Sequence, residues 1–145
     1  MALQVIEHNV NTEGPPAAVF ALLADGSTWP RWSPIDAFEL EAPGAGDPEG
    51  VGAIRVFTTG RHVSRERVVT VQPDEVFSYD LLSGMAIRDY RAVVTLSPLG
   101  EGTSIHWRST FRAKLPLSGR LYQRELGRFI GQVVEGLARA AVSAV

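Results

Sequence analysis

Three side chains in the middle of the chain could take part in proton transfer: Glu66, Arg67 and Tyr90. A carboxyl group that is enclosed among apolar residues has a raised pKa, and it can then act as an acid or a base. A tyrosine that is buried up to its hydroxyl group is suited to orienting a ligand. We therefore take these three residues as the catalytic candidates, for a reaction that needs a shaped pocket and a group that moves a proton.

Other kinds of catalytic site lack their sequence patterns. The three histidines, His8, His62 and His106, are far apart, and the chain has no cysteine, so no spacing typical of metal ligands occurs. There is no nucleophile elbow for a hydrolase triad. The glycine-rich segment 44–52 is not followed by Gly-Lys-Ser/Thr, and no dinucleotide-binding fingerprint is present. We expect neither a metal ion nor a cofactor.

The candidate residues lie on strands whose alternation indicates which side chains face inward. The strand expected at 103–113 is more apolar on the face of Trp107, and the strand at 76–82 is more apolar on the face of Tyr79. The same test on the strand at 88–97 places Arg88 and Tyr90 inward. The inward sets are Thr103, Ile105, Trp107, Ser109 and Phe111; Phe77, Tyr79 and Leu81; and Arg88, Tyr90, Ala92, Val94 and Leu96.

The strand expected at 62–71 can be read in two ways. Its valines favour the odd-numbered face, which would bring Arg67 inward. A two-residue turn at Pro73-Asp74 would instead pair Tyr79 with Val68 and would bring Glu66 inward. We favour the second register, because a bulge or a frayed edge tolerates an outward valine. The choice decides which charge, Glu66 or Arg67, faces the interior.

A long amphipathic helix is expected from about Pro116 to the end of the chain. Its apolar side chains recur at steps of three and four residues, which places them on one side. Gly127 and Gly131 interrupt this helix, and each glycine costs about 0.5 to 1 kcal/mol relative to alanine. They indicate a close backbone approach, a bend or room for another group. The apolar side comprises Tyr122, Leu126, Phe129, Val133, Leu137 and Ala140.

The order of the elements predicts an α+β domain. A strand at about 4–11 precedes two short helices, around Val19–Leu23 and Trp29–Pro34, and six strands and the long helix follow. Short turns between strands favour antiparallel pairing of neighbours. We predict one domain, 1–145, with a curved seven-stranded antiparallel sheet around the C-terminal helix. Trp32 is expected inside, with Trp29 covering the end. The other strands are expected at about 35–40, 52–59, 62–71, 76–82, 88–97 and 103–113.

Composition and charge limit the partners. The chain of 145 residues has 45% hydrophobic and 21% charged residues and a net charge of −2, which is typical of a globular protein. The basic residues are scattered, without a basic run or interleaved aromatic residues, so we expect no nucleic-acid binding. No transmembrane segment and no signal peptide are evident, and we expect a cytoplasmic protein. The oligomeric state is left open, a homodimer included.

Five stretches, in this order along the chain, resemble the START-like superfamily, also called SRPBCC, which has the Bet v 1-like helix-grip fold. Their order and spacing carry the resemblance, because each stretch alone is short. Within the superfamily the chain is most similar to the bacterial polyketide cyclase/dehydrase-type branch, and the resemblance covers nearly the whole chain. The stretches are Val19–Asp25, Trp29–Pro34, Gly50–Gly52, Tyr90–Leu96 and Gly102–Trp107.

The resemblance implies a cavity between the sheet and the C-terminal helix that binds a hydrophobic small molecule, such as a polyketide, a lipid or an aromatic metabolite. The alternative function is that of a polyketide aromatase/cyclase, which catalyses aldol cyclisation and dehydration in the same cavity. Combining the resemblance with the inward faces, we expect these ligand-binding residues: Trp32, Phe57, Tyr79, Tyr90, Trp107, Ser109, Phe111, Phe129 and Val133.

Overall fold

The computed structural model describes residues 2–143, so the first residue and the last two of the predicted domain lie outside the described part. Its seven strands form one antiparallel sheet in the order β1-β7-β6-β5-β4-β3-β2. The helices are α1 (Pro16–Ala24), a short 3₁₀ turn η1 (Gly26–Thr28), α2 (Trp29–Trp32) and α3 (Gly119–Ser143). The strands are β1 (Leu3–Thr12), β2 (Ala37–Ala42), β3 (Ile54–Thr59), β4 (His62–Gln72), β5 (Val76–Ser83), β6 (Ile87–Leu99) and β7 (Gly102–Ala113).

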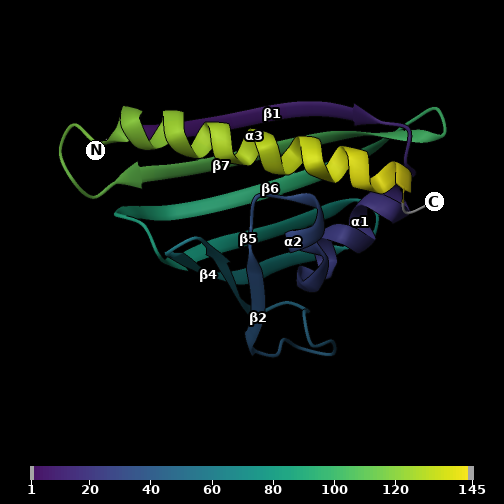
Figure 1. Ribbon diagram of the computed structural model, residues 1–145, viewed down its shortest axis with the longest axis horizontal. Coiled ribbons are helices and arrows are strands. Elements are labelled where there is room, and N and C mark those ends of the chain that lie inside the picture. The colour runs from purple at the N-terminus through teal and green to yellow at the C-terminus, as the bar shows by residue number, and fades with distance from the viewer. Residues whose placement is uncertain (1, 144–145) are drawn as a thin grey trace.

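The sheet curves around α3, which runs along it beside β1 (Figure 1). The short helices α1 and α2 lie near the C-terminal half of α3. Strands that follow one another in sequence are neighbours from β2 to β7, while β1 pairs with β7 at the other edge. This arrangement is the predicted helix-grip fold, and the prediction is confirmed.

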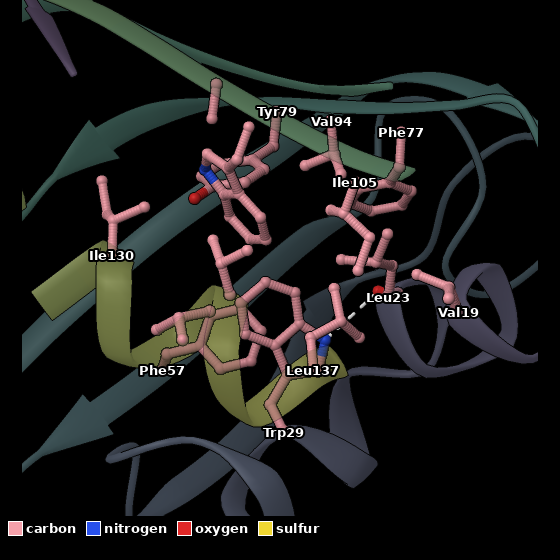
Figure 2. Close-up of a cluster of buried hydrophobic side chains, with 14 of the residues drawn as sticks. Val19, Leu23, Trp29, Phe57, Phe77, Tyr79, Val94, Ile105, Ile130 and Leu137 are labelled. Carbon is pink, nitrogen blue, oxygen red and sulfur yellow. Dashed lines mark hydrogen bonds between the residues drawn. The ribbon is translucent and has the colours of Figure 1, made fainter. Parts of the chain in front are cut away.

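The two halves of α3 are buried to different extents. In the C-terminal half, Val134 and Leu137 are completely enclosed, and Leu137 is seen in the cluster of Figure 2. Burying one such side chain contributes about 1.5 to 3 kcal/mol. In the N-terminal half, Tyr122, Leu126 and Phe129 belong to the predicted apolar side but are only partly buried. The interior is therefore packed under one half of the helix and more open under the other.

Two glycines of α3 mark close approaches to neighbouring elements. A Cβ atom at Gly136 would lie 1.8 Å from the carbonyl oxygen of Trp32, so only glycine lets α2 sit against α3 here. A Cβ atom at Gly131 would lie 3.1 Å from the ring of His8 on β1. The same ring forms a hydrogen bond of 2.9 Å with the carbonyl oxygen of Gly127. Of the three predicted reasons for a glycine, Gly131 therefore gives room for another group, the His8 side chain, and a close approach of two backbones occurs at Gly136.

A β-bulge in β6 changes the predicted face of its first residues. The pairing of β6 with β7 shifts between Arg88 and Arg91, and Asp89 has a left-handed backbone with φ of 56°. The extra residue turns Arg88 out to solvent and brings Ile87 inward, while Tyr90 stays buried. The expectation that Arg88 faces inward is therefore wrong, because simple alternation does not hold across a bulge.

The two tryptophans near α2 exchange their expected positions. Trp29 is the deeper residue, 2% exposed, and its indole packs against Phe57 and Trp107. Its Nε1 donates a hydrogen bond of 3.2 Å to the carbonyl oxygen of Leu23. Trp32 lies at the α2–α3 junction, where its Nε1 donates to Thr28 Oγ1 at 3.0 Å. Trp29 therefore fills the interior, and Trp32 joins the two helices.

Candidate functional site

A pocket of about 660 Å³ opens between the N-terminal half of α3 and the β3–β4 side of the sheet. Its wall is mainly apolar, with a few polar groups among aromatic and aliphatic side chains, as is typical of small-molecule sites. Gly84, Met85 and Ala86, in the turn between β5 and β6, form part of this wall. Its lining residues are Ile35, Phe57, Thr59, His62, Ser64, Glu66, Gly84, Met85, Ala86, Tyr122, Glu125, Leu126 and Phe129.

The register of β4 places Glu66 on the pocket. Val68 pairs with Tyr79 and Glu66 pairs with Leu81, as predicted, although the turn holds three residues rather than two, since Gln72 pairs with Val76 and the bulge between Val68 and Thr70 restores the register. Val63 points outward and is 47% exposed, and the register shifts twice along the β4–β5 ladder. The register that we favoured is confirmed, and bulges accommodate the valines that argued against it.

The Glu66 carboxyl group has an unusual environment. It is half-buried and keeps some contact with the pocket, while its Oε1 is enclosed and has no hydrogen-bond partner among the described residues. Desolvation raises the pKa of Glu66 to about 7, and the attraction of the Arg55 guanidinium only partly opposes this rise. At neutral pH the carboxyl group therefore exchanges readily between its protonated and ionised forms.

Arg67 lies on the opposite face of β4. Its side chain is exposed to solvent, because alternation along the strand sends residues 66 and 67 to different sides. Arg67 is therefore removed from the candidates that line the interior. Of the two charged residues Glu66 and Arg67, it is Glu66 that faces the interior.

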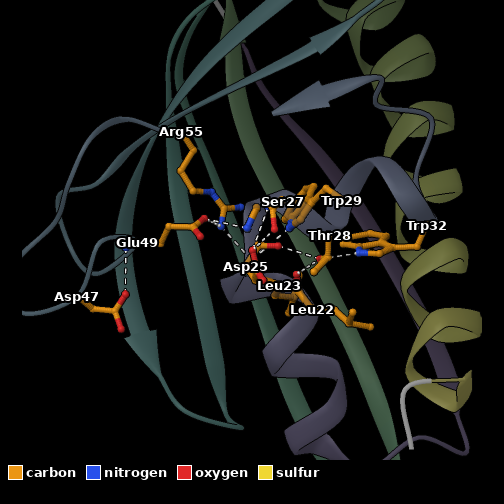
Figure 3. Close-up of polar contacts among 11 residues, drawn as sticks. Leu22, Leu23, Asp25, Ser27, Thr28, Trp29, Trp32, Asp47, Glu49 and Arg55 are labelled. Carbon is orange, nitrogen blue, oxygen red and sulfur yellow. Dashed lines mark hydrogen bonds and ion pairs between the residues drawn. The ribbon is translucent and has the colours of Figure 1, made fainter. Parts of the chain in front are cut away.

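Arg55 is the buried cation of this region, and the sequence-based selection omitted it. Its side chain is fully enclosed, with the guanidinium 5.0 Å from the ring centroids of Trp29, Phe57 and Phe77. Its Nη1 donates to the carbonyl oxygen of Leu23 at 3.0 Å and forms an ion pair of 3.3 Å with Glu49 (Figure 3). These contacts tie the end of α1 and the loop before β3 to the sheet.

The position of Arg55 follows from a signal in the sequence. Arg55 stands two residues before Phe57 on β3, so the two side chains share the inward face. It also pairs directly with Glu66 across the β3–β4 ladder. Two of its nitrogens, Nε and Nη2, are buried without hydrogen-bond partners among the described residues. Burial lowers the pKa of Arg55, while Glu66 and then Glu49 oppose this effect. Glu66 and Arg55 thus form a pair of incompletely satisfied charges beside the pocket.

The comparisons with known proteins agree with this architecture. A profile of the family described as "Polyketide cyclase / dehydrase and lipid transport" matches residues 4–144. The chain belongs to this family. No curated protein matches the sequence at a significant level.

Solved structures with the same fold have low sequence identity to this chain. A START superfamily protein from Mycobacterium smegmatis has a TM-score of 0.84 at 15% identity, over 98% of this chain and 99% of that one. Ara h 8.0201 has a TM-score of 0.75 at 18% identity, over 98% and 99%. Norcoclaurine synthase from Thalictrum flavum, in complex with dopamine and hydroxybenzaldehyde, has a TM-score of 0.75 at 14% identity, over 98% and 88%. These likenesses establish the fold.

In this family member, only Phe57 and Phe129 of the expected ligand-binding residues line the pocket, together with the catalytic candidate Glu66. The others are buried side chains that do not line it, so we reassign them to the core. Trp107, for example, packs edge-on against Trp29 and Tyr79. The side chains so reassigned are Trp32, Tyr79, Tyr90, Trp107, Ser109, Phe111 and Val133.

Tyr90 illustrates why the core differs from the pocket. Its hydroxyl group shares a hydrogen bond of 3.0 Å with Ser109 Oγ, and its ring packs against Tyr79 and Phe111. Burial raises the pKa of Tyr90 to about 12, although the hydrogen bond with Ser109 works in the opposite direction. Burial also raises the pKa of Tyr79. The hydroxyl of Tyr90 therefore stays protonated at neutral pH and holds β6 to β7.

Two further findings concern the residues that the structure describes. Within 2–143, no group of three or more histidine or acidic side chains is placed to hold a metal ion. Over the same range, no helix is both long enough and apolar enough to cross a membrane.

Proposed function

We propose that the protein binds a hydrophobic small molecule in the pocket between α3 and the β3–β4 side of the sheet. The observation that carries this proposal is the pocket itself, which has about 660 Å³ of space and a mainly apolar wall. Family membership supports it, because the family is described by polyketide and lipid substrates. The polyketides, lipids and aromatic metabolites expected from the sequence are all candidate ligands.

The polar groups of the pocket suggest how the ligand is oriented. Glu66 offers a carboxyl group with an unsatisfied oxygen at an otherwise apolar surface. A polar group on the ligand that donates a hydrogen bond to this carboxyl would satisfy it, and the apolar body would then pack against Phe57, Leu126 and Phe129. Affinity would come mainly from apolar area removed from water, at about 25 cal/mol per Å² before the cost of association.

Dye binding to the purified protein tests the proposal. Nile red should bind and become fluorescent, and Leu126→Trp, which adds a large side chain on the pocket wall, should weaken binding at least about tenfold. Arg128→Trp is the matched control, because it adds the same ring on an exposed part of α3. A wild-type protein that fails to bind the dye, or equal binding by Leu126→Trp, would overturn the proposal. Mass spectrometry of molecules that co-purify with the native protein would then identify the ligand class.

A second function is favoured by the position of the Glu66 carboxyl group on the pocket wall, where its Oε1 is buried without a hydrogen-bond partner among the described residues and desolvation raises its pKa to about 7. An acid or base is most effective when its pKa is near the working pH, so Glu66 is suited to proton transfer in aldol closure and dehydration. A linear poly-β-ketone should then be turned over by the wild-type protein, and Glu66→Gln should bind it but form no product. If the wild-type protein binds the compound and forms no product, the binding function stands alone.

A further inference from the structure

Three leucines around the connection between β7 and α3 project into solvent. Leu115, Leu117 and Leu121 are 57%, 102% and 61% exposed, and we call them the leucine patch. The connection lies at one end of the sheet, where the chain leaves β7 and turns back into α3 (Figure 1). Several large apolar side chains exposed within seven residues indicate a surface that another molecule covers.

The backbone holds Leu117 outward at a cost. Its φ of 64° is left-handed, a conformation that glycine or asparagine adopts more readily than leucine. The turn is nevertheless well formed, because the hydroxyl group and the amide of Ser118 both donate to the carbonyl oxygen of Leu115, at 2.7 and 3.4 Å. A left-handed backbone at a residue other than glycine is strained, and such strain is concentrated at functional surfaces.

Within residues 114–124, which carry the leucine patch, every charged side chain is basic. Lys114, Arg120 and Arg124 are exposed. Glu125 follows directly, but its distance to Arg124 is 4.0 Å and the arginine side chain remains 73% exposed. Exposed leucines between basic side chains match the apolar interior and the negative headgroups of an anionic bilayer.

Hydrogen bonds connect the loop that carries the leucine patch to the wall of the pocket. The amide of Lys114 donates to the carbonyl oxygen of Ala86 at 3.0 Å. The amide of Ala86 in turn donates to the hydroxyl group of Tyr122 at 3.3 Å. Ala86 and Tyr122 both line the pocket, so the hydrogen bonds join the loop that carries the patch to the pocket wall.

We propose that the leucine patch inserts into the surface of an anionic lipid bilayer, with Lys114, Arg120 and Arg124 on the headgroups. Docking in this way brings the side of the pocket at Ala86 and Tyr122 near the bilayer. Transfer of an apolar ligand between the pocket and the bilayer is a further step, and it rests on the proposed function. The docking itself does not depend on what the pocket holds. If the leucine patch instead bound a second copy of the chain or a protein partner, that association would not require anionic lipid.

Vesicle flotation with the full chain tests the proposal. The protein should float with vesicles of equal parts phosphatidylglycerol and phosphatidylcholine, and much less with phosphatidylcholine alone. Leu117→Asn removes the apolar side chain but suits the left-handed backbone, so the fold should be kept and the apparent affinity should fall at least about tenfold. The matched control is Leu99→Asn, because Leu99 is also exposed but lies in the β6–β7 hairpin. The control should float like the wild type.

Other outcomes separate the explanations. The double substitution Arg120→Gln and Arg124→Gln should weaken flotation with the anionic vesicles. Flotation that Leu117→Asn leaves unchanged would overturn the proposal, because attraction by charge alone would then explain it. A dimer in analytical ultracentrifugation that Leu117→Asn dissociates would overturn it too, in favour of a second copy. Nile red binding by Leu117→Asn should equal that of the wild type, so the failure of docking and the failure of the pocket can be told apart.

Discussion

Replacing Glu66 by glutamine should change how stability depends on pH. The pKa of Glu66 rises from 4.5 to about 7 on folding, so the folded protein resists ionisation of this carboxyl. The ionisation of Glu66 therefore destabilises the folded wild-type protein as the pH rises above 4.5, and this destabilisation is complete above about pH 7. This pKa shift corresponds to a loss of about 3 kcal/mol in the free energy of unfolding. Because Glu66 is only half-buried and solvent in the pocket screens its charge, we expect a loss of about 2 kcal/mol.

The measurement is urea denaturation of the wild type and Glu66→Gln at pH 5 and pH 8. The free energy of unfolding of the variant, relative to the wild type, should increase by about 1.5 kcal/mol between these two pH values, because part of the destabilisation is already present at pH 5. The difference at pH 5 combines the packing of the amide with the part of the ionisation cost that is already present above pH 4.5. Ser64→Ala changes another pocket residue without a titrating group, and its curve should run parallel to that of the wild type. Parallel curves for Glu66→Gln as well would refute a raised pKa at this site.

Three further substitutions test the packing and the site. Arg55→Ala should lower the free energy of unfolding by about 3 to 5 kcal/mol, because it removes a fully buried side chain together with its hydrogen bond to Leu23 and its ion pair with Glu49; an effect below about 1 kcal/mol would contradict this. Gly136→Ala should destabilise by more than about 3 kcal/mol, since its Cβ would overlap the carbonyl of Trp32. The matched Gly127→Ala meets only side-chain atoms at 3.9 Å and should be neutral or stabilising by up to about 1 kcal/mol, as chemical denaturation can show.

Much of the fold could be predicted because its signals are local. The steps of three and four residues in α3 and the alternation in β7 are properties of short segments, and both were confirmed. The pairing of Val68 with Tyr79 was predicted, but its premise of a two-residue turn was wrong: Gln72 pairs with Val76 across a three-residue turn, and the bulge between Val68 and Thr70 restores the predicted pairing. Alternation failed in β6, where the bulge at Asp89 has no clear signal in the sequence.

The candidate site was harder to predict, because an inward face does not distinguish a pocket from a packed core. Trp107 and Phe129 both belong to apolar faces, but Trp107 is enclosed by Trp29 and Tyr79 whereas Phe129 borders open space. Arg55 was omitted because a charged residue is seldom fully buried, although its spacing from Phe57 indicated the inward face.

The sequence by itself determined the order of the elements and the amphipathic α3, since these depend on spacing along the chain, and it favoured Glu66 over Arg67 as the inward charge of β4. Only the tertiary structure decided where space remains between the layers. Under the C-terminal half of α3, Trp29 and the close contact at Gly136 fill the interior. Under the N-terminal half, Leu126 and Phe129 face a pocket that no side chain fills. That difference depends on side-chain volumes brought together from distant segments, which no local pattern records.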